Sequence, residues 1–217
     1  MHFDNTDETN FGPSVEVSVR PARAVFFFGK WLFDKIMSIA LIPLLALFAF
    51  GLLILNPFFN KGPLFFAQKR MGKHCQPFIA LKFRTMTENA AVKRDANDPL
   101  ELDRITPMGR FLRKSRIDEL PQILNVLKGE MSLIGPRPDY FDHAVQYLNT
   151  IKGYRERHAV LPGISGLAQT EVGYVEGTEA TRKKVSADLY YISNIGFKLD
   201  TWILWRTFAV ILGRSGL

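Results

Sequence analysis

The sequence has very little cysteine and histidine for its length. A single cysteine, Cys75, occurs among 217 residues, which excludes a fold held together by disulfides and fits a reducing compartment. The four histidines follow no spacing that is typical of a metal site, so they predict no zinc or similar centre. Any chemistry must therefore depend on other side chains.

Acidic residues are also scarce relative to basic ones. The chain has 28 Lys and Arg against 21 Asp and Glu, which gives a formal charge of +7. Hydrophobic residues nevertheless make up 47%, and the mean hydropathy is +0.01. Eighteen phenylalanines exclude a disordered chain, and the length suits one globular domain. A chain this basic and this apolar suggests a partner that is both hydrophobic and anionic.

One long stretch, residues 36–55, contains no charged residue. Twenty helical residues reach about 30 Å, which is the thickness of the hydrocarbon core of a bilayer. The stretch follows a polar lead and is too long for the apolar core of a signal peptide, so a cleaved signal is not expected. We therefore predict that this segment enters a membrane.

Two features favour a helix that dips into the membrane and returns over one that crosses it. Pro43 lies inside the stretch, where a proline bends or breaks a helix. Both flanks are basic, and positive flanks prefer the cytoplasmic side. The flanking charges are Arg20, Arg23, Lys30 and Lys35 before the stretch, and Lys61, Lys69, Arg70 and Lys73 after it. The alternative is a spanning helix with a tolerated proline.

The rest of the chain predicts a small mixed domain. Asn56 and Pro57 are expected to end the apolar helix. The local patterns then predict strands at 65–68 and 78–81 around a turn at 72–76, a loop at 87–103, and helices at 120–128, 139–158 and 180–212, the last as one or two helices.

The predicted fold class is α+β and mainly helical. We expect a polar N-terminal tail at residues 1–21 and a re-entrant membrane helix at 22–59. A compact cytoplasmic domain with a small β-hairpin is expected to follow at 60–217.

Asp118 and Glu119 form the candidate catalytic pair. Pro121 is favoured at the first position of a helix, which would place both carboxylates at the helix entrance. The positive end of the helix dipole there favours carboxylates and incoming phosphates. Four cations precede the pair, namely Arg110, Arg113, Lys114 and Arg116. This arrangement suits phosphate chemistry, but a salt-bridged helix start at the surface is an open alternative.

Several motifs occur in an order that resembles a known family. They read KFRTM at 82–86, DELPQ at 118–122, MSLIGPRP at 131–138 and PGISGLAQ at 162–169, after GPLFFAQKRMG at 62–72 and Lys30 with Asp34. Together they are similar to the bacterial sugar transferases, the small monotopic phosphoglycosyl transferases, over roughly residues 28–212.

The resemblance implies a reaction. Members transfer a sugar-1-phosphate from a UDP-sugar to undecaprenyl or another polyprenol phosphate and release UMP, which starts exopolysaccharide or glycan synthesis. It also implies a re-entrant helix broken near Pro43, in the inner bacterial membrane, with the catalytic domain on the cytoplasmic face.

The resemblance also implies site residues. Asp118 would be the nucleophile of a covalent phosphosugar intermediate, with Glu119 assisting, and both would be ligands of Mg²⁺. The residues expected to bind the phosphates or nucleotide of the substrate are Arg113, Arg137, Lys82 and Arg84.

The chain departs from the family pattern in three places. Cys75 stands where members commonly carry a glycine in the first hairpin turn. Members often have a phosphate-binding arginine soon after the position of Gln169, whereas the next arginine here is Arg182. Either Arg182 takes that role or the donor site differs. Without the multi-span region of large members, the sequence is expected to be the small, catalytic-core form.

A membrane-tethered basic adaptor that binds anionic lipid without catalysis is the non-enzymatic alternative. It accounts for the charge and the anchor but gives no role to Asp118 and Glu119. Nucleic acid is not expected as a partner, because the aromatic strip of a single-strand binder is missing. The expected partners are a UDP-sugar, polyprenol phosphate and membrane lipids. The sequence leaves open which sugar is transferred and whether the chain forms a homo-oligomer.

Overall fold

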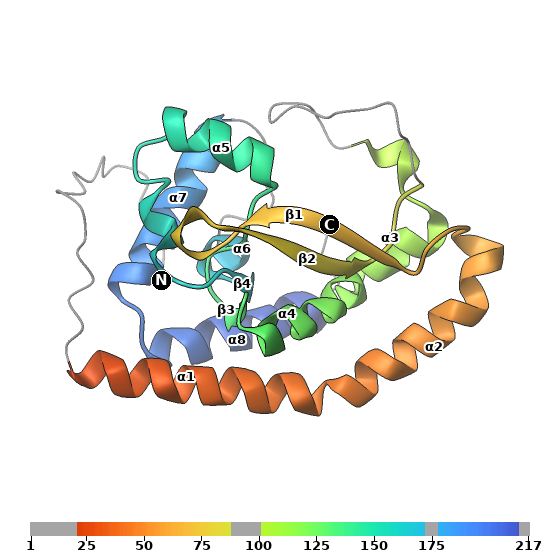
Figure 1. Ribbon diagram of the computed structural model, residues 1–217, viewed down its shortest axis with the longest axis horizontal. Coiled ribbons are helices and arrows are strands. Elements are labelled where there is room, and N and C mark those ends of the chain that lie inside the picture. The colour runs from red at the N-terminus through yellow and green to blue at the C-terminus, as the bar shows by residue number, and fades with distance from the viewer. Residues whose placement is uncertain (1–20, 88–100, 172–177, 213–217) are drawn as a thin grey trace.

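The computed structural model describes residues 21–87, 101–171 and 178–212 (Figure 1). Helices dominate, and the strands form two small sheets of two strands each. The predicted mainly helical α+β architecture is therefore confirmed. Nearly all of the predicted tail at 1–21, and most of the loop predicted at 87–103, lie outside the described residues.

The apolar segment forms two helices that meet at a break. Helix α1 (Pro21–Ala40) and helix α2 (Ile42–Phe59) join at Leu41, and they run as a bent rod along one side of the molecule (Figure 1). Pro43 lies in the first turn of α2, where its missing N–H needs no partner. The prediction of a break near Pro43 is confirmed.

The C-terminal end of α2 differs from the prediction. The helix does not end at Asn56 and Pro57 but continues through Phe59. Pro57 removes only one backbone hydrogen bond, and the last turn closes after it because the N–H of Asn60 donates to the carbonyl of Asn56 at 2.9 Å. Asn60 thereby becomes the residue at which the apolar helix joins the rest of the chain.

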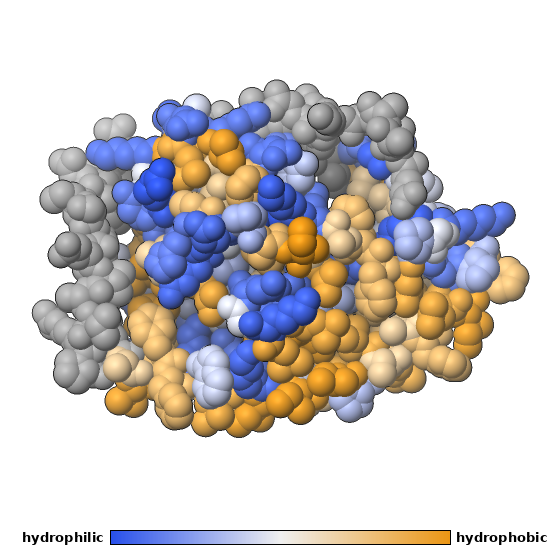
Figure 2. Space-filling model, viewed as in Figure 1, coloured by the Kyte–Doolittle hydropathy of each residue, from blue (hydrophilic) through white to orange (hydrophobic). Residues whose placement is uncertain are grey.

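One face of the α1–α2 rod carries exposed apolar side chains. Figure 2 shows hydrophobic residues along the lower edge of the molecule, where the two helices lie. Among the described helices, α2 alone is long and apolar enough to cross a membrane. Its other face packs inward, where Leu45 and Leu52 share a core with Phe83, Leu112 and Ile123.

The predicted hairpin is confirmed, with longer strands. Strand β1 (Phe65–Met71) pairs antiparallel with strand β2 (Pro77–Phe83) around the short 3₁₀ turn η1 (Lys73–Cys75). His74 and Cys75 both have left-handed backbones, with φ of 55° and 59°. A glycine adopts this conformation without steric penalty, which explains why glycine suits the position of Cys75.

The central helices follow the hairpin. The 3₁₀ turn η2 (Leu102–Arg104) leads to helix α3 (Pro107–Lys114), the 3₁₀ helix η3 (Ile117–Gln122) and helix α4 (Ile123–Lys128). The helical path predicted at 120–128 thus starts earlier, at Ile117, as the 3₁₀ helix η3, and the α-helix itself begins at Ile123. Pro121 lies inside η3 instead of at a first helical position. Its end is as predicted, because Gly129 takes a left-handed φ of 85° just after α4.

A second sheet, which the sequence did not indicate, joins two of the motifs. Strand β3 (Ser132–Ile134) pairs in parallel with strand β4 (Gly163–Ser165). The backbones approach so closely that a Cβ on Gly163 would lie 2.1 Å from the nitrogen of Gly135. The glycines of these motifs therefore permit the contact that closes this part of the fold.

The single helix predicted at 139–158 is wrong. The chain forms helix α5 (Phe141–Thr150), a turn, and the 3₁₀ helix η4 (Glu156–Ala159). Ile151, whose backbone is extended, ends α5, and Gly153, with a φ of 82°, lies in the turn that follows.

The C-terminal part forms helices that pack back onto α1. These are α6 (Leu167–Glu171), α7 (Thr178–Ser193) and α8 (Phe197–Leu212), so the stretch predicted at 180–212 is two helices. Helix α8 contacts α1 through an ion pair between Lys30 and Asp200 at 2.5 Å, and through the rings of Phe26 and Phe197, which meet edge to face.

Candidate active site

The paired carboxylates lie in the first turn of η3, which packs against β2. Arg116, immediately before η3, has a left-handed backbone with a φ of 57°, and this sharp turn reverses the chain after α3. Asp118 and Glu119 are only 6% and 5% exposed. The alternative of a salt-bridged helix start at the surface is therefore wrong, because the pair is buried.

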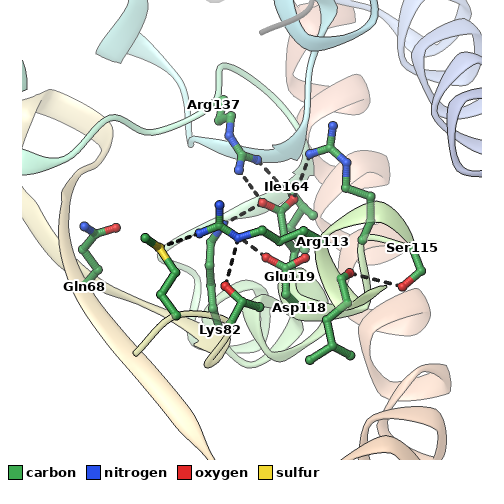
Figure 3. Close-up of polar contacts among 12 residues, drawn as sticks. Gln68, Lys82, Arg113, Ser115, Asp118, Glu119, Arg137 and Ile164 are labelled. Carbon is green, nitrogen blue, oxygen red and sulfur yellow. Dashed lines mark hydrogen bonds and ion pairs between the residues drawn. The ribbon is translucent and has the colours of Figure 1, made fainter. Parts of the chain in front are cut away.

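Glu119 is fully engaged by cations. Lys82, from β2, donates to its Oε1 at 2.7 Å, and Arg137, from the segment after β3, contacts both of its oxygens (Figure 3). Arg116 lies 3.7 Å away. Burial alone would raise the pKa of Glu119, but the charges of Arg137 and Lys82 hold it well below its usual range. Glu119 is therefore a fixed anion that orients its cations.

Asp118, although adjacent, has a different environment. Its Oδ2 lies 4.0 Å from Nζ of Lys82, and its Oδ1 is buried with no hydrogen-bond partner among the described residues. Burial raises the pKa of Asp118, while nearby Lys82 acts in the opposite direction. A poorly solvated carboxylate oxygen beside cations is suited to attack an electrophile or to bind a cation.

Arg113 and Lys82 border the pair from two sides. Arg113, near the end of α3, donates from Nε to the hydroxyl of Thr85 at 2.9 Å, and its charge acts on Asp118 (Figure 3). Burial lowers the pKa of Lys82, although Glu119 opposes that shift. Of the predicted site residues, the structure thus brings together Lys82, Arg113, Asp118, Glu119 and Arg137.

Two predicted phosphate ligands lie elsewhere. Arg84 is 5% exposed, and its guanidinium donates to the backbone carbonyl of Asn60 instead of facing the pair. Arg182, on α7, has an exposed side chain that lies 3.8 Å from Glu179. Pro43 is in the apolar rod, as its predicted structural role requires.

The local sequence pattern identifies Arg116 only as a member of a basic run. Its contact with Glu119 depends on the left-handed turn that it adopts, and nothing in the local pattern indicated that turn. The pattern also misses Arg157, whose Nη2 donates to the carbonyl of Arg137 at 2.7 Å. A buried arginine far along the chain gives no local signal of this contact.

A cavity of about 360 Å³ lies between α1 and the turn from α4 to β3. It is lined by residues such as Trp31, Met131 and Tyr191, and neither Asp118 nor Glu119 is among them. The candidate active site is therefore recognised by its concentration of charge and not by this cavity.

The carboxylates fit a metal that is shared with a substrate. Within the described ranges, no group of three or more His, Cys, Asp or Glu side chains could hold an ion alone. Mg²⁺ commonly binds through one or two carboxylates together with substrate phosphates. Asp118 fits this role through its unpartnered Oδ1, whereas Glu119 would first have to release Arg137 or Lys82.

Curated relatives are similar over most of the chain. An Aeromonas hydrophila UDP-N-acetylgalactosamine-undecaprenyl-phosphate N-acetylgalactosaminephosphotransferase is 40% identical over 193 residues, 88% of this chain and 45% of the relative. A Klebsiella pneumoniae UDP-glucose:undecaprenyl-phosphate glucose-1-phosphate transferase is 36% identical over 208 residues, 93% of this chain and 44% of the relative. The exopolysaccharide production protein PSS of Rhizobium leguminosarum is 35% identical over 200 residues, 86% and 96% respectively.

The chain thus spans less than half the length of the first two relatives but nearly all of the third. The family model described as bacterial sugar transferase matches residues 25–214, which include the carboxylate pair, its cations and both small sheets. The chain belongs to the bacterial sugar transferase family.

Proposed function

We propose that the chain transfers a sugar-1-phosphate from a UDP-sugar to undecaprenyl phosphate or a similar polyprenol phosphate, with release of UMP. This would be the first membrane step of exopolysaccharide or glycan synthesis. The observation that carries the proposal is the unpartnered, buried oxygen of Asp118 beside a glutamate that is saturated with cations. The names of two relatives, which act on undecaprenyl phosphate with different UDP-sugars, support the substrate class.

In the first step, a carboxylate oxygen of Asp118 attacks the phosphorus that carries the sugar. The bond from this phosphorus to the oxygen bridging the two phosphates breaks, and UMP leaves with the electron pair. The sugar phosphate is then held on Asp118 as an acyl phosphate. This step needs only the soluble donor, so the lipid need not be present at the same time.

In the second step, a phosphate oxygen of the polyprenol phosphate attacks the same phosphorus. The bond to Asp118 breaks, the carboxylate is regenerated, and polyprenol-diphospho-sugar is the product. A two-step route allows one small site to serve a water-soluble donor and a membrane acceptor in turn.

The cations around the pair have distinct parts in this proposal. Arg113 and Lys82, which act on Asp118, are placed to bind phosphate oxygens of the donor. Arg137 donates to Glu119, so its guanidinium also lies beside the carboxylate pair. Asp118, and Glu119 once a cation is released, would hold Mg²⁺, which would supply further neutralisation of the diphosphate.

We also propose that α1 and α2 form a re-entrant hairpin and that the remaining domain lies on the cytoplasmic face of the bacterial inner membrane. Residues on both sides of the charge-free stretch 36–55 contact the same domain. Lys35 of α1 donates to the carbonyls of Val126 and Leu127, and Asn60 after α2 donates to the carbonyl of Arg84. Helix ends on opposite sides of a membrane could not both make such contacts.

Cysteine labelling tests this topology. In a Cys75→Ser background, single cysteines at Val25 and Lys61, which are both exposed, report on the two ends of the rod. A reagent that does not cross the membrane is expected to label neither site in intact cells and both after permeabilisation. Labelling of either site from outside would contradict the re-entrant topology.

The activity is tested by UMP release from a panel of UDP-sugars, with polyprenol phosphate and Mg²⁺, using Asp118→Asn as the control. We expect release with at least one donor and none above background from the variant. The adaptor alternative predicts binding to anionic vesicles with no UMP release from any donor. Full turnover by Asp118→Asn would contradict the covalent route.

A further inference from the structure

Asn60 lies where three segments converge, namely the end of α2, the end of β2 and the start of α3. Its side chain is 4% exposed. Its Nδ2 donates to the backbone carbonyl of Arg84 at 2.8 Å, and its Oδ1 accepts from the hydroxyl of Thr106 at 3.2 Å. The guanidinium of Arg84 returns a bond to the carbonyl of Asn60. The end of the apolar helix is therefore bonded to both neighbouring segments.

Thr106 fixes the start of α3 against the chain that follows β2. It caps α3, because its hydroxyl accepts from the N–H of Gly109 at 2.9 Å, and its own N–H donates to the carbonyl of Thr85 at 3.1 Å. A Cβ on Gly109 would lie 1.9 Å from the same carbonyl oxygen, so the helix packs against Thr85 with no intervening side chain. Displacement of Thr106 would move α3 as a whole.

Arg113 is carried by the far end of that short helix. Its Nε donates to the hydroxyl of Thr85, the residue on which the helix start also rests. The contacts thus run without a gap from Asn60, through Thr106 and Thr85, to Arg113 beside Asp118.

We propose that Asn60 is a positioning residue for Arg113, and that Arg84 completes this arrangement instead of binding phosphate itself. The inference rests on the proposed function, since Arg113 is there a ligand of the donor phosphates. It connects the point where the chain leaves the apolar helix with the geometry of the site. A small displacement of a phosphate-binding group can lower a rate by up to about a hundredfold.

Asn56, in the last turn of α2, offers a matched control. It is 7% exposed, and its Nδ2 donates to the carbonyl of Gly62 at 2.7 Å. Like Asn60 it is a buried amide at the end of α2, but the described contacts of its side chain do not include β2, Thr106 or Arg84. Asn56→Ala and Asn60→Ala should therefore destabilise the fold similarly and differ in their effect on the site.

The experiment measures initial rates of UMP release on the full chain, at saturating polyprenol phosphate and with Mg²⁺, while the concentration of the accepted UDP-sugar is varied. We expect Asn60→Ala to raise the KM for the donor about tenfold and Asn56→Ala to change it less than about threefold, at similar melting temperatures. Equal effects of the two substitutions would overturn the inference. A wild-type chain that releases UMP from no donor would instead overturn the proposed function, and this inference with it.

A double-mutant cycle separates positioning from general damage. If Asn60 acts through Arg113, Asn60→Ala should have less than about a twofold further effect in an Arg113→Ala background. An undiminished tenfold effect there would contradict the inference.

Should Asn60→Ala fail to fold, Thr106→Ser and Thr106→Ala provide the second pair. The serine variant keeps the hydroxyl and should retain the wild-type KM for the donor, whereas the alanine variant should have a raised KM. Equal KM values for the two variants would contradict the inference.

Discussion

Two buried clusters of charge lie side by side in this protein, and they differ in how completely their carboxylates are paired. The dyad cluster consists of Lys82, Asp118, Glu119 and Arg137. The Arg157 cluster consists of Asp139, Tyr154, Arg157, Lys184 and Asp188. One short segment serves both, because the side chain of Arg137 enters the first and that of Asp139 enters the second.

The Arg157 cluster satisfies its carboxylates. Asp188 accepts from Arg157 at 2.9 Å, and both side chains are 1% exposed. Asp139 accepts from Tyr154 at 2.7 Å and from Arg157 at 2.5 Å, and it also contacts Lys184. Burial would raise the pKa of Asp139, but Lys184 and Arg157 hold it well below its usual range.

The dyad cluster pairs its carboxylates less completely. Glu119 is as well paired as Asp139, but Asp118 keeps one buried oxygen with no partner among the described residues. A buried polar atom without a partner destabilises a fold, so a site that retains one invites a functional explanation. Paired charge thus holds this fold together, whereas the unpaired oxygen of Asp118 marks the candidate chemistry.

The largest expected effect separates activity from stability. Asp118→Asn should lower UMP release by at least about a thousandfold, because it removes the proposed nucleophile. The melting temperature should stay within a few degrees, since the substitution removes a charge that burial disfavours. Both are measured on the same preparation, and a large loss of stability would mean that Asp118 holds the fold as Asp139 does.

The same chemical change in the other cluster should have the opposite signature. Asp188→Asn removes one partner of a buried ion pair and should lower the free energy of unfolding by about 3 kcal/mol. For a chain of this size that corresponds to about 6–12 °C in thermal unfolding. If Asp188→Asn left the melting temperature unchanged and abolished UMP release, the division between the two clusters would be wrong.

Glu119→Gln should give an intermediate result. The amide keeps the shape of the side chain but removes the charge that Arg137 and Lys82 face, so stability should fall by about 1–3 kcal/mol. The released cations should pair with Asp118 instead and weaken it as a nucleophile, which we expect to lower turnover about 10–100-fold. Unchanged turnover, measured by UMP release at saturating donor, would show that Glu119 has no part in the site.

The smallest expected effect is a difference between the pH at which UMP release is lost and the pH at which the fold is lost. Because burial raises the pKa of Asp118, UMP release should fall with decreasing pH before an ordinary aspartate would protonate. The pKa values of Glu119 and Asp139 are lowered, so their stabilisation exists above the usual carboxylate range and is lost only as pH falls through the lower folded values. Protonation of Asp118 does not itself unfold the chain, since the folded state binds that proton more tightly than the unfolded state does.

Activity should therefore disappear at a higher pH than the fold. A pH–rate profile and circular dichroism over the same range check this order. If rate and helical signal fell together, acid inactivation would be unfolding and would not report on Asp118.

The features that the sequence predicted correctly depend on local patterns. The charge-free run at 36–55 and Pro43 indicate a broken apolar helix, and two short strand-like runs around a turn indicate the hairpin. Lys82 lies within β2 and contacts Glu119, whereas β2 ends at Phe83, so Arg84 does not continue the alternation of the strand. Arg84 is consequently free to turn towards Asn60, which no local pattern indicates.

The contacts that build the site are not local. Arg137 reaches Glu119 because β3 pairs in parallel with β4, about thirty residues further along the chain. Such short parallel strands leave too few residues for a period of two to be recognised. The sequence could thus name Asp118 and Glu119 as a pair, but only the structure shows which of the two carries the unpaired oxygen.

The mass of the intact protein tests whether Asp118 is the nucleophile. The chain is incubated with its UDP-sugar and Mg²⁺ without lipid acceptor, denatured and weighed. We predict a gain equal to one sugar phosphate on wild-type protein, lost on addition of polyprenol phosphate and never seen on Asp118→Asn. UMP release that requires the lipid acceptor and leaves no mass gain would contradict the account.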